Sequence, residues 1–571
     1  MLFKRFLNLS WLYPYVQLDP AADAVDVAES NNVKQVAIIG AGAAGSSAAY
    51  HLHKFAEQEG IAINLTVFEK TERIGGRTLT VNVYDNPLDP VELGASIFVE
   101  VNHILYNASN EFGLALKDPG SDEDGLLGIW DGKKFVYSQD SASSGWWNLA
   151  KLFWRYGTAP YYTKQLVDKT VATFLRLYEA PNFPFKSLTE RTIDLGLVKI
   201  TGLTGQQFLA ENKLDGAFAH DIVQASTRVN YASNLEYIHG LGTMVAMAPE
   251  GAVAVAGGNW RIFAKMVETS CASLYLNTSV SSISTESSKN TSFRREKYRI
   301  RTSKGQENAK AEAHPMAFDD VVIATPYQFS DISHADDLLQ QPIDDIPYAT
   351  LHVSLFASPF RFSPAFFNLD AGAVIPISVL STLGTNDAPQ SGDEGVGSAG
   401  FFSATQVKVV TNPKTLSTEY VYKIFSPHKV TPEFLSRLLG AEVPETFTRP
   451  HDVAQESNET AVEPISWYHA TVFRPYPQKL PRVTFQDPIL RDGLYYTSGI
   501  ESFISTMETS ALMGMNVARL IVDDYLEASR NDTEEVPVLV EDSEPAQIVL
   551  AGETETLEKE REHPVAAQVE L

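Results

Sequence analysis

A glycine-rich turn between a predicted strand and a predicted helix constrains the fold of this chain more than any other feature. Residues 36–39 read Val-Ala-Ile-Ile, an apolar run typical of a buried parallel strand. In the turn that follows, Gly40 permits the sharp change of direction, Gly42 lets the backbone approach a pyrophosphate, and Gly45 lets the helix at 46–55 pack against the strand. The amides at the start of that helix favour a diphosphate. The segment therefore predicts a dinucleotide-binding βαβ unit.

A second strand is predicted at residues 61–68, and it ends at Glu69, which lies 24 residues after Gly45. A carboxylate there can accept both hydrogen bonds of an adenosine ribose diol and would repel a 2′-phosphate. A Gly-Gly-Arg sequence follows at 75–77, and we expect Arg77 to lie over the phosphates with paired charged donors. Glycine turns also join strands to helices without binding a ligand. The second strand, the acidic residue and the Gly-Gly-Arg extension together favour the dinucleotide.

Later segments distinguish FAD from a nicotinamide dinucleotide. The stretch 73–80, followed by residues 92–96, resembles the flavin-dependent amine oxidase and phytoene desaturase superfamily. Residues 320–326 are similar to the strand and turn that rejoin the FAD domain in that superfamily. Residues 493–501 are similar to the segment before the helix, here 505–526, whose N-terminus reaches the flavin ring. The implied fold class is α/β, with a Rossmann-type FAD-binding domain interleaved with an α+β substrate domain.

Other blocks narrow the resemblance to one family. The segments at 92–98, 224–231, 257–260, 467–469, 474–477 and 499–511 are similar to the prenylcysteine oxidase, or prenylcysteine lyase, family, in order over residues 33–527. The resemblance implies oxidative cleavage of the thioether of farnesyl- or geranylgeranylcysteine. In that reaction flavin takes a hydride from the allylic carbon on sulfur, and water attacks the thiocarbenium. A prenyl aldehyde and free cysteine leave, and dioxygen reoxidises the flavin to give hydrogen peroxide.

The glycine motif and the resemblance together nominate the cofactor-binding residues. These are Gly40, Gly42, Gly45, Glu69, Lys70, Gly76, Arg77, Gly94, Ser96, Gly499, Glu501 and Met507. We expect non-covalent FAD, because the single cysteine, Cys271, lies far in sequence from the Gly499 block. No metal-ligand spacing stands out in the sequence.

Two residues are nominated for catalysis, since the sequence shows neither a Ser-His-Asp order nor a paired-carboxylate motif. His469 could deprotonate the attacking water, although a hydrogen-bonded structural histidine is the favoured interpretation. Glu501 could orient water or hydrogen-bond the flavin, and helix capping is an equal alternative. Glu508 is expected to face the interior or to cap a helix. This chemistry depends more on positioning than on acid–base groups.

The order of the motifs predicts interleaved domains. The FAD-binding domain takes residues 31–118, 241–335 and 489–530, and the substrate domain takes a mainly helical segment at 119–240 and a sheet segment at 336–488. Residues 1–30 are predicted as a signal or flexible terminus, and residues 531–571 as an acidic disordered tail. Residues 287–295 and 384–400 are predicted as surface loops.

A prenyl chain requires a long apolar cavity, since each buried CH₂ contributes about 0.8 kcal/mol. The helical segment carries large apolar side chains at helical spacings, for which ordinary core packing is the favoured interpretation. They are Trp146, Trp147, Leu152, Phe153, Trp154, Tyr161, Phe174, Leu175, Leu177 and Tyr178. Alternating apolar and polar positions at 348–372 and 398–425 predict the strands of a substrate-domain sheet.

The formal net charge of −26 argues against nucleic acid and against an anionic membrane as partners. Part of the charge is local, because residues 531–571 carry 12 acids and 2 bases. No stretch is apolar enough to predict a transmembrane helix, and the oligomeric state is left open.

The family resemblance implies a lysosome-like or vacuolar lumen. Lys4 and Arg5 precede an apolar run at 6–18 as in a secretory signal, with polar interruptions that leave its cleavage open. Seven Asn-x-Ser/Thr sequons could accept glycans there, although Asn64 is expected in a buried strand.

Three alternatives remain at this point. A flavin amine oxidase acting on a polyamine shares the N-terminal motifs and the hydride abstraction, but its aromatic cage is not evident. A desaturase or isomerase of long polyenes would use a similar cavity. A non-catalytic escort protein that keeps the FAD fold is the third, and a folded FAD-free preparation would favour it.

Overall fold

The computed structural model describes residues 33–119, 125–140, 145–286, 296–305, 311–334, 338–339, 342–447 and 462–534. The predicted N-terminal segment at 1–30, the predicted loop at 287–295 and residues 535–571 of the predicted tail lie outside the described residues. The chain up to Asp524 forms one compact unit, and a second unit begins at Tyr525.

A six-stranded sheet joins the three segments that carry the flavin motifs. Its order is β10 (Ser273–Tyr275), β2 (Ile63–Phe68), β1 (Lys34–Ile39), β14 (Asp320–Ile323), β22 (Leu494–Tyr496) and β21 (Ile489–Arg491). The pairs are parallel except for β22 with β21, and Ile38 is in register with Val67 on one side and Val322 on the other. The apolar run after Gln35 is buried as predicted. This sheet confirms the predicted α/β class.

Asn64 is exposed, contrary to expectation, because it lies near the start of β2, before the strand enters the core at Leu65.

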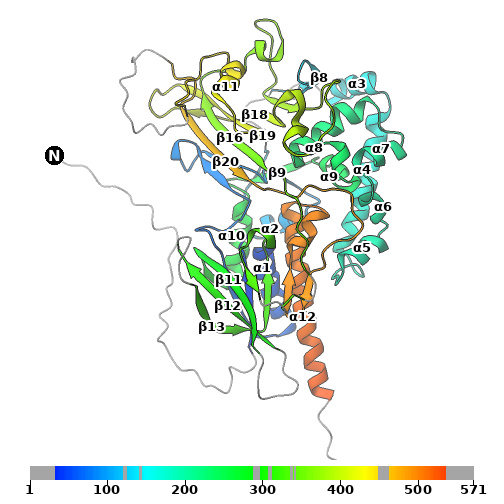
Figure 1. Ribbon diagram of the computed structural model, residues 1–571, viewed down its shortest axis with the longest axis vertical. Coiled ribbons are helices and arrows are strands. Elements are labelled where there is room, and N and C mark those ends of the chain that lie inside the picture. Colours follow the sequence, from blue (N-terminus) through cyan, green and yellow to red (C-terminus); the bar gives the residue numbers. More distant parts are fainter. Residues whose placement is uncertain are drawn as a thin grey trace, which may run out of the picture. The chain divides into compact units, whose positions relative to one another are not determined.

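Two helices bring their N-termini to the same edge of this sheet. Helix α1 (Ala43–Glu59) begins directly after the glycine turn and ends at Gly60, which has a φ of 69°. Helix α12 (Met507–Glu534) runs beside it (Figure 1), and a Cβ on Gly514 would lie 2.2 Å from the carbonyl oxygen of Ala44. Glycine therefore permits direct contact between the two backbones. Because α12 continues to Glu534, the first residues of the predicted disordered tail are helical.

The second large sheet has seven strands and forms the centre of the upper part of Figure 1. Its order is β20 (Trp467–Phe473), β16 (Leu351–Ser358), β19 (Thr418–Ser426), β18 (Ser403–Thr411), β17 (Ser378–Ser381), β7 (Leu126–Trp130) and β8 (Phe135–Asp140). Only β17 and β7 pair in parallel. The predicted alternation at 348–372 and 398–425 supplies β16, β18 and β19.

The segment at 119–240 is helical from residue 145 onward but starts with the β7–β8 hairpin, which the sequence analysis did not anticipate. The hairpin joins the seven-stranded sheet through β7, so its pairing partner lies about 250 residues away in β17. The helices are α3 (Gly145–Tyr156), α4 (Ala159–Leu175), α5 (Leu188–Asp194), α6 (Val198–Thr201), α7 (Gly205–Glu211), α8 (Gln224–Tyr231) and α9 (Gly240–Ala246).

The remaining elements connect or cover the two large sheets. They are β3 (Thr80–Asn82), β4 (Pro90–Glu92), β5 (Phe98–Val99), α2 (His103–Glu111), β6 (Leu116–Lys117), β9 (Ala252–Val255), α10 (Trp260–Thr269), β11 (Thr278–Glu286), β12 (Lys297–Lys304), β13 (Glu312–Phe318), β15 (Ser333–His334) and α11 (Pro432–Leu439).

The predicted surface loop at 384–400 is partly internal. Arg228 of α8 is fully buried, and its guanidinium donates to the carbonyl oxygens of Gly395 and Val396, both at 2.7 Å. A buried guanidinium requires several acceptors, and this segment supplies them. The interpretation of residues 384–400 as a surface loop was therefore wrong for the part around Gly395, because composition does not show which backbone carbonyls a distant arginine will bind.

Candidate cofactor and substrate site

A cavity of about 1050 Å³ lies between the carboxyl ends of the Rossmann strands and one face of the seven-stranded sheet. Small-molecule sites usually measure about 300–1,000 Å³, so this cavity can hold a large ligand or two ligands together. Most of the nominated cofactor residues line it. They are Gly40, Gly42, Glu69, Lys70, Gly76, Arg77, Gly94, Ser96, Glu501 and Met507.

The glycine turn has the geometry that a diphosphate requires. Gly40 has a φ of 105°, which only glycine adopts readily, and its amide donates to the carbonyl of Phe68 at 2.7 Å. A Cβ on Gly42 would meet nothing closer than the Cα of Gly76, at 3.8 Å. The surface above Gly42 is therefore open to the cavity, at the N-terminus of α1, as a bound pyrophosphate needs.

Gly45 and Gly499 do not line the cavity but let backbone segments touch beneath it. A Cβ on Gly45 would lie 1.9 Å from the carbonyl oxygen of Gly40, and a Cβ on Gly499 would lie 2.5 Å from that of Gln486. Gly45 thus has the helix-packing role proposed for it, and Gly499 has a similar role under the segment that leads into α12.

Glu69 lies buried in the cavity wall and is already hydrogen-bonded. One carboxylate oxygen accepts from the amide of Ala41 at 2.8 Å, and the other accepts from the amide and hydroxyl of Thr71 at 2.9 and 2.7 Å. A carboxylate has about four acceptor positions, so about one is left for a ligand. Glu69 can therefore accept one ribose hydroxyl directly, where the sequence suggested two.

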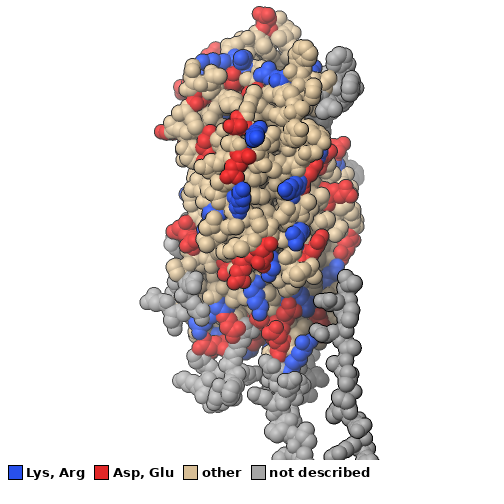
Figure 2. All heavy atoms as spheres, turned by 90° about the vertical axis from the view of Figure 1, so that its right-hand side faces the viewer, with Lys and Arg blue, Asp and Glu red and all other residues tan. Residues whose placement is uncertain are grey.

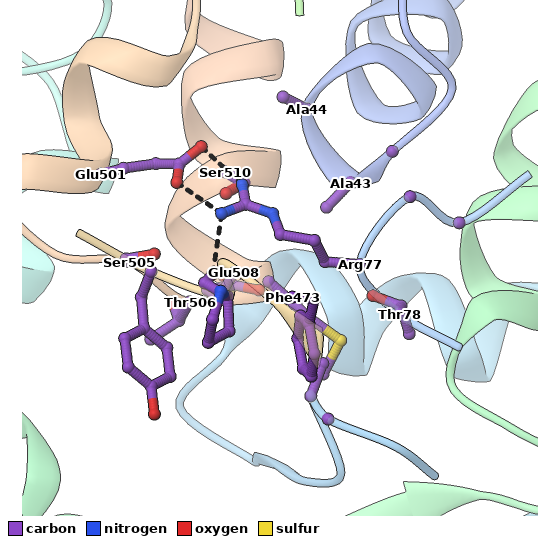
Figure 3. A pocket seen from close by; sticks show the side chains of 18 of the residues that line it. Ala43, Ala44, Arg77, Thr78, Phe473, Glu501, Ser505, Thr506, Glu508 and Ser510 are labelled. Atoms are coloured by element: carbon purple, nitrogen blue, oxygen red, sulfur yellow. Dashed lines mark hydrogen bonds and ion pairs between the residues drawn. The ribbon is translucent and has the colours of Figure 1, made fainter. Parts of the chain in front are cut away.

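Arg77 and Glu501 form a bidentate ion pair at the centre of the site (Figure 3). The two guanidinium nitrogens lie 2.7 and 2.6 Å from the two carboxylate oxygens, and one of them also donates to the carbonyl of Pro475 at 2.7 Å. The hydroxyl of Tyr348 donates to the same carboxylate at 3.0 Å. Burial lowers the pKa of Arg77, but the Glu501 carboxylate more than offsets it and raises that pKa above its ordinary value. The Arg77 guanidinium is therefore charged.

This pair changes the interpretation of both residues. Arg77 was expected to lie over the phosphates, yet its paired donors are directed to Glu501. Glu501 was expected to cap a helix, to orient water or to hydrogen-bond the flavin, and in the structure both of its carboxylate oxygens accept from Arg77. The motif spacing could not show this, because the partners come from opposite ends of the chain.

Glu508 connects α12 to α2. Its two carboxylate oxygens accept from the amides of Ile104 and Leu105 at 2.9 and 3.0 Å, at the N-terminus of α2. Burial raises its pKa to about 7, despite these two hydrogen bonds. Met507 lines the cavity beside it. The expectation of an interior capping role for Glu508 therefore agrees with its contacts.

Lys423 enters the cavity from β19 and was not among the residues nominated from the sequence. Its ammonium donates to the hydroxyl of Ser96 at 3.0 Å and to the carbonyl of Glu92 at 3.1 Å. Burial lowers the pKa of Lys423 to about 8, and burial raises that of Glu92 to about 7. The only signal in the sequence was a lysine within residues 420–425, whose other members are aromatic or aliphatic.

The rest of the cavity is mainly apolar. Its walls there come from α4, α8, α9 and the facing strands, and they include Phe98, Val171, Phe174, Leu175, Val229, Val245, Leu380, Phe425 and Phe473. Of the aromatic and aliphatic residues nominated for a prenyl cavity, Phe174 and Leu175 line it and Leu177 lies in the core, whereas Trp154 and Tyr161 are exposed. The side chains of Trp146 and Trp147 lie outside the described residues.

Comparison with known proteins decides the family. The model of the prenylcysteine lyase family matches residues 139–535. The chain belongs to the prenylcysteine lyase family. In the N-terminal part of the chain, residues 38–110 match the model of an NAD(P)-binding Rossmann-like domain. The resemblance stated from the sequence blocks is therefore confirmed.

Individual relatives agree with this membership of the prenylcysteine lyase family. The chain is 28% identical to farnesylcysteine lyase of Arabidopsis thaliana, covering 90% of this chain and 92% of the relative. It is 28% identical to prenylcysteine oxidase 1 of Bos taurus, covering 90% of this chain and 91% of the relative. Among solved structures, cyclohexylamine oxidase from Brevibacterium oxydans IH-35A shares the fold, with a TM-score of 0.51 at 16% identity over 86% of this chain and 99% of that one.

In this member of the prenylcysteine lyase family, none of the described residues that line the cavity is a histidine. His469 lies on β20, where its ring stacks on Trp467 with centroids 6.4 Å apart, and burial lowers its pKa. The structure thus gives His469 no contact with the cavity. Phe473, on the same face of β20, lines the cavity, whereas His469 lies four residues earlier, about 13 Å away along the strand. No group of three His, Cys, Asp or Glu in the described part of the chain is placed to hold a metal ion.

Proposed function

We propose that the protein is an FAD-dependent oxidase that cleaves the thioether of prenylcysteines and releases a prenyl aldehyde, free cysteine and hydrogen peroxide. The observation that carries the proposal is that the glycine cradle and an apolar chamber are parts of one cavity. Membership of the prenylcysteine lyase family supports the substrate class, and the size of the cavity supports a cofactor and a substrate bound together.

The cradle supports FAD held without a covalent bond. The open surface over Gly42, at the N-terminus of α1, fits a diphosphate, and the N-terminus of α12 fits a flavin. The remaining acceptor of Glu69 fits a ribose hydroxyl. Cys271, the single cysteine of the chain, is exposed and does not line the cavity. A cysteinyl link to a flavin in this cavity therefore has no residue to form it.

The apolar chamber supports a prenyl chain as the other ligand. Side chains of α4, α8 and α9 surround it, and each methylene buried there contributes about 0.8 kcal/mol to binding. A prenylcysteine also carries an α-carboxylate. Lys423, held by Ser96 at 3.0 Å, is a cation placed among the apolar walls to bind that carboxylate. We nominate Lys423 as the residue that orients the substrate head group.

Bound FAD would supply the hydride acceptor. The residues of this chain would bind, orient and exclude water. Both carboxylate oxygens of Glu501 accept from the Arg77 guanidinium, so we assign Glu501 to fixing the position of the Gly499 segment and not to the role of a base. The proposal therefore needs no protein base, which agrees with a reaction whose cation is stabilised by sulfur and an allylic double bond. A lysosome-like or vacuolar lumen remains our proposed location, and it rests on the family.

The test is to mix the purified protein anaerobically with S-farnesylcysteine and, separately, with a polyamine, and to follow the absorbance of oxidised flavin. We expect bleaching by the thioether alone, followed by farnesal and, after oxygen is admitted, hydrogen peroxide. Bleaching by the polyamine alone would assign the protein to amine oxidation. A folded preparation that binds no flavin would favour the non-catalytic escort protein. A yellow protein that neither compound reduces would overturn the assignment of prenylcysteine as the substrate.

A further inference from the structure

Four large aromatic side chains are exposed at the tip of the α3–α4 hairpin. Phe153 and Trp154, near the end of α3, are 63% and 93% exposed, and Tyr161 and Tyr162, at the start of α4, are 62% and 52% exposed. Exposed apolar residues normally occur singly, whereas these four flank one short turn and form what we call the aromatic tip.

The opposite side of the same hairpin is firmly packed. Tyr156 of α3 is buried against Phe218, with ring centroids 5.4 Å apart, and its hydroxyl donates to Asp221 at 2.9 Å. Val167 and Phe174 of α4 are buried as well. The hairpin is therefore held by its inner face, and the aromatic tip does not contribute to the core.

The charge of the hairpin is opposite to that of the chain. Helices α3 and α4 carry four basic residues and one acid, Asp168, in a protein with a formal charge of −26. The basic residues are Lys151, Arg155, Lys164 and Lys169. Acids facing them are Asp221, which pairs with Arg155, and Asp168 and Glu250, which pair with Lys164. Lys151 and Lys169 are exposed. On the face shown in Figure 2, basic and acidic side chains are interspersed on a largely uncharged surface.

Helix α4 connects the aromatic tip to the cavity. Tyr161 and Tyr162 lie near its start, and Val171, Phe174 and Leu175 near its end line the apolar chamber. At 1.5 Å per residue, the distance along the helix from Tyr161 to Val171 is about 15 Å. Lys164 also pairs with Glu250 at 2.8 Å, next to Pro249, which lines the cavity. The aromatic tip is thus close to the wall of the chamber.

We propose that the aromatic tip docks onto the surface of an anionic phospholipid bilayer. Tryptophan and tyrosine favour the interface between headgroups and acyl chains, and neighbouring lysines are attracted to anionic headgroups. No helix in the described ranges is long and apolar enough to cross a bilayer, so the contact is peripheral. The negative charge of the whole chain, which argued against such a surface, is outweighed locally by this hairpin.

Docking would place the cavity near the phase into which prenylcysteines partition. This consequence rests on the proposed function, whereas the docking itself does not. The aromatic tip would then act in delivering substrate, and soluble prenylcysteine would reach the chamber without it.

The experiment measures flotation of the full-length protein with vesicles of phosphatidylcholine alone and with added phosphatidylserine. One variant replaces the aromatic tip (Phe153→Ser, Trp154→Ser, Tyr161→Ser and Tyr162→Ser). A matched control replaces exposed apolar residues elsewhere (Leu88→Ser, Val374→Ser and Leu416→Ser), which are 82%, 77% and 77% exposed. We expect the wild type and the control to bind the anionic vesicles, and the tip variant to bind at least about tenfold less tightly, with an unchanged melting temperature.

Several outcomes would overturn the proposal. The wild type could fail to float with either vesicle, or the control could lose as much binding as the tip variant. Self-association of the wild type that the tip variant abolishes, without any vesicle binding, would assign the aromatic tip to a protein interface.

A second measurement separates docking from catalysis. We expect the tip variant to lose turnover of vesicle-borne S-farnesylcysteine and to keep turnover of the soluble compound. If neither form is turned over by the wild type, the proposed function fails, and flotation still decides the docking.

Discussion

Arg77 and Glu501, which are 424 residues apart in sequence, meet in a bidentate ion pair with donor–acceptor distances of 2.6 and 2.7 Å. The pair joins the Gly-Gly-Arg loop of the first βαβ unit to the segment that leads into α12. Both segments belong to the wall of the cofactor cavity, so one contact closes the site from two sides. Its role is to hold the walls of the site in place.

Replacing Glu501 by Gln should destabilise the protein and weaken FAD binding together. Removing one partner of a fully buried pair costs about 3–5 kcal/mol, and we expect about 2–3 kcal/mol here because the Arg77 side chain is 36% exposed. Thermal melts and flavin titrations measure both effects. Tyr348→Phe is the matched control, since it removes only the third hydrogen bond to Glu501 and should cost about 1 kcal/mol. A Glu501→Gln protein with normal stability and FAD affinity but lost turnover would instead assign Glu501 to the chemistry.

Gly42→Ala should lose FAD binding, whereas Gly45→Ala should lose the stability of the fold. A Cβ on Gly42 has only an ordinary contact at 3.8 Å and its φ of −78° suits any residue, so the apoprotein should fold while FAD occupancy falls. A Cβ on Gly45 would lie 1.9 Å from the oxygen of Gly40, so that variant should lose stability before any ligand is added. Flavin content and apoprotein melting temperature distinguish the two. Full flavin occupancy in Gly42→Ala would remove the turn from the binding site.

Lys423→Met should raise the KM for S-farnesylcysteine by at least about tenfold, because a charged hydrogen bond contributes about 1.5–3 kcal/mol. S-farnesylcysteamine, which lacks the carboxylate, is the control substrate, and its KM should change little. An equal rise in KM for both substrates would show that Lys423 supports the cavity without binding the substrate carboxylate.

The same contact predicts a pH dependence. The pKa of Lys423 is about 8, so the ammonium is charged below that pH and becomes neutral above it. We expect the KM for S-farnesylcysteine to rise as the pH passes through about 8 in the wild type. Lys423→Arg stays charged and should not show that rise. A rise of the same size in the arginine variant would place the titrating group elsewhere.

Glu508 should make the protein more stable in acid. Its pKa rises from 4.5 to about 7 on folding, so the fold favours the protonated form. The stability contributed by that proton is fully present below 4.5 and is lost as the pH rises through about 7, a change of about 3 kcal/mol. Melting temperatures between about pH 5 and pH 8 test this, and Glu508→Gln should flatten the dependence. An equally steep profile in the glutamine variant would exclude Glu508 as its source.

The glycine turn and its flanking strand were interpreted correctly because their conformation depends on residues that are close in sequence. The apolar run before Gly40 could only be a buried strand, and the glycine spacing allowed one turn geometry. Residues 320–326 were expected, from the resemblance, to form a strand and turn that rejoin the FAD domain, and residues 320–323 pair with β1. His469 had no such constraint. Its strand was recognisable, but which part of β20 reaches the cavity depends on its pairing with β16. Phe473 reaches the cavity, and His469, four residues earlier on the same face, does not.

The sequence by itself determined the glycine cradle, the two-sheet architecture and the family, since these depend on contacts between neighbouring residues or on the order of motifs. Only the tertiary structure decided that Arg77 binds Glu501, that Lys423 enters the cavity and that Trp154 faces outward. Each of these depends on which face of a helix or strand meets a segment hundreds of residues away. The hydrophobic periodicity limits which faces can be buried, but long-range packing determines which face meets which segment.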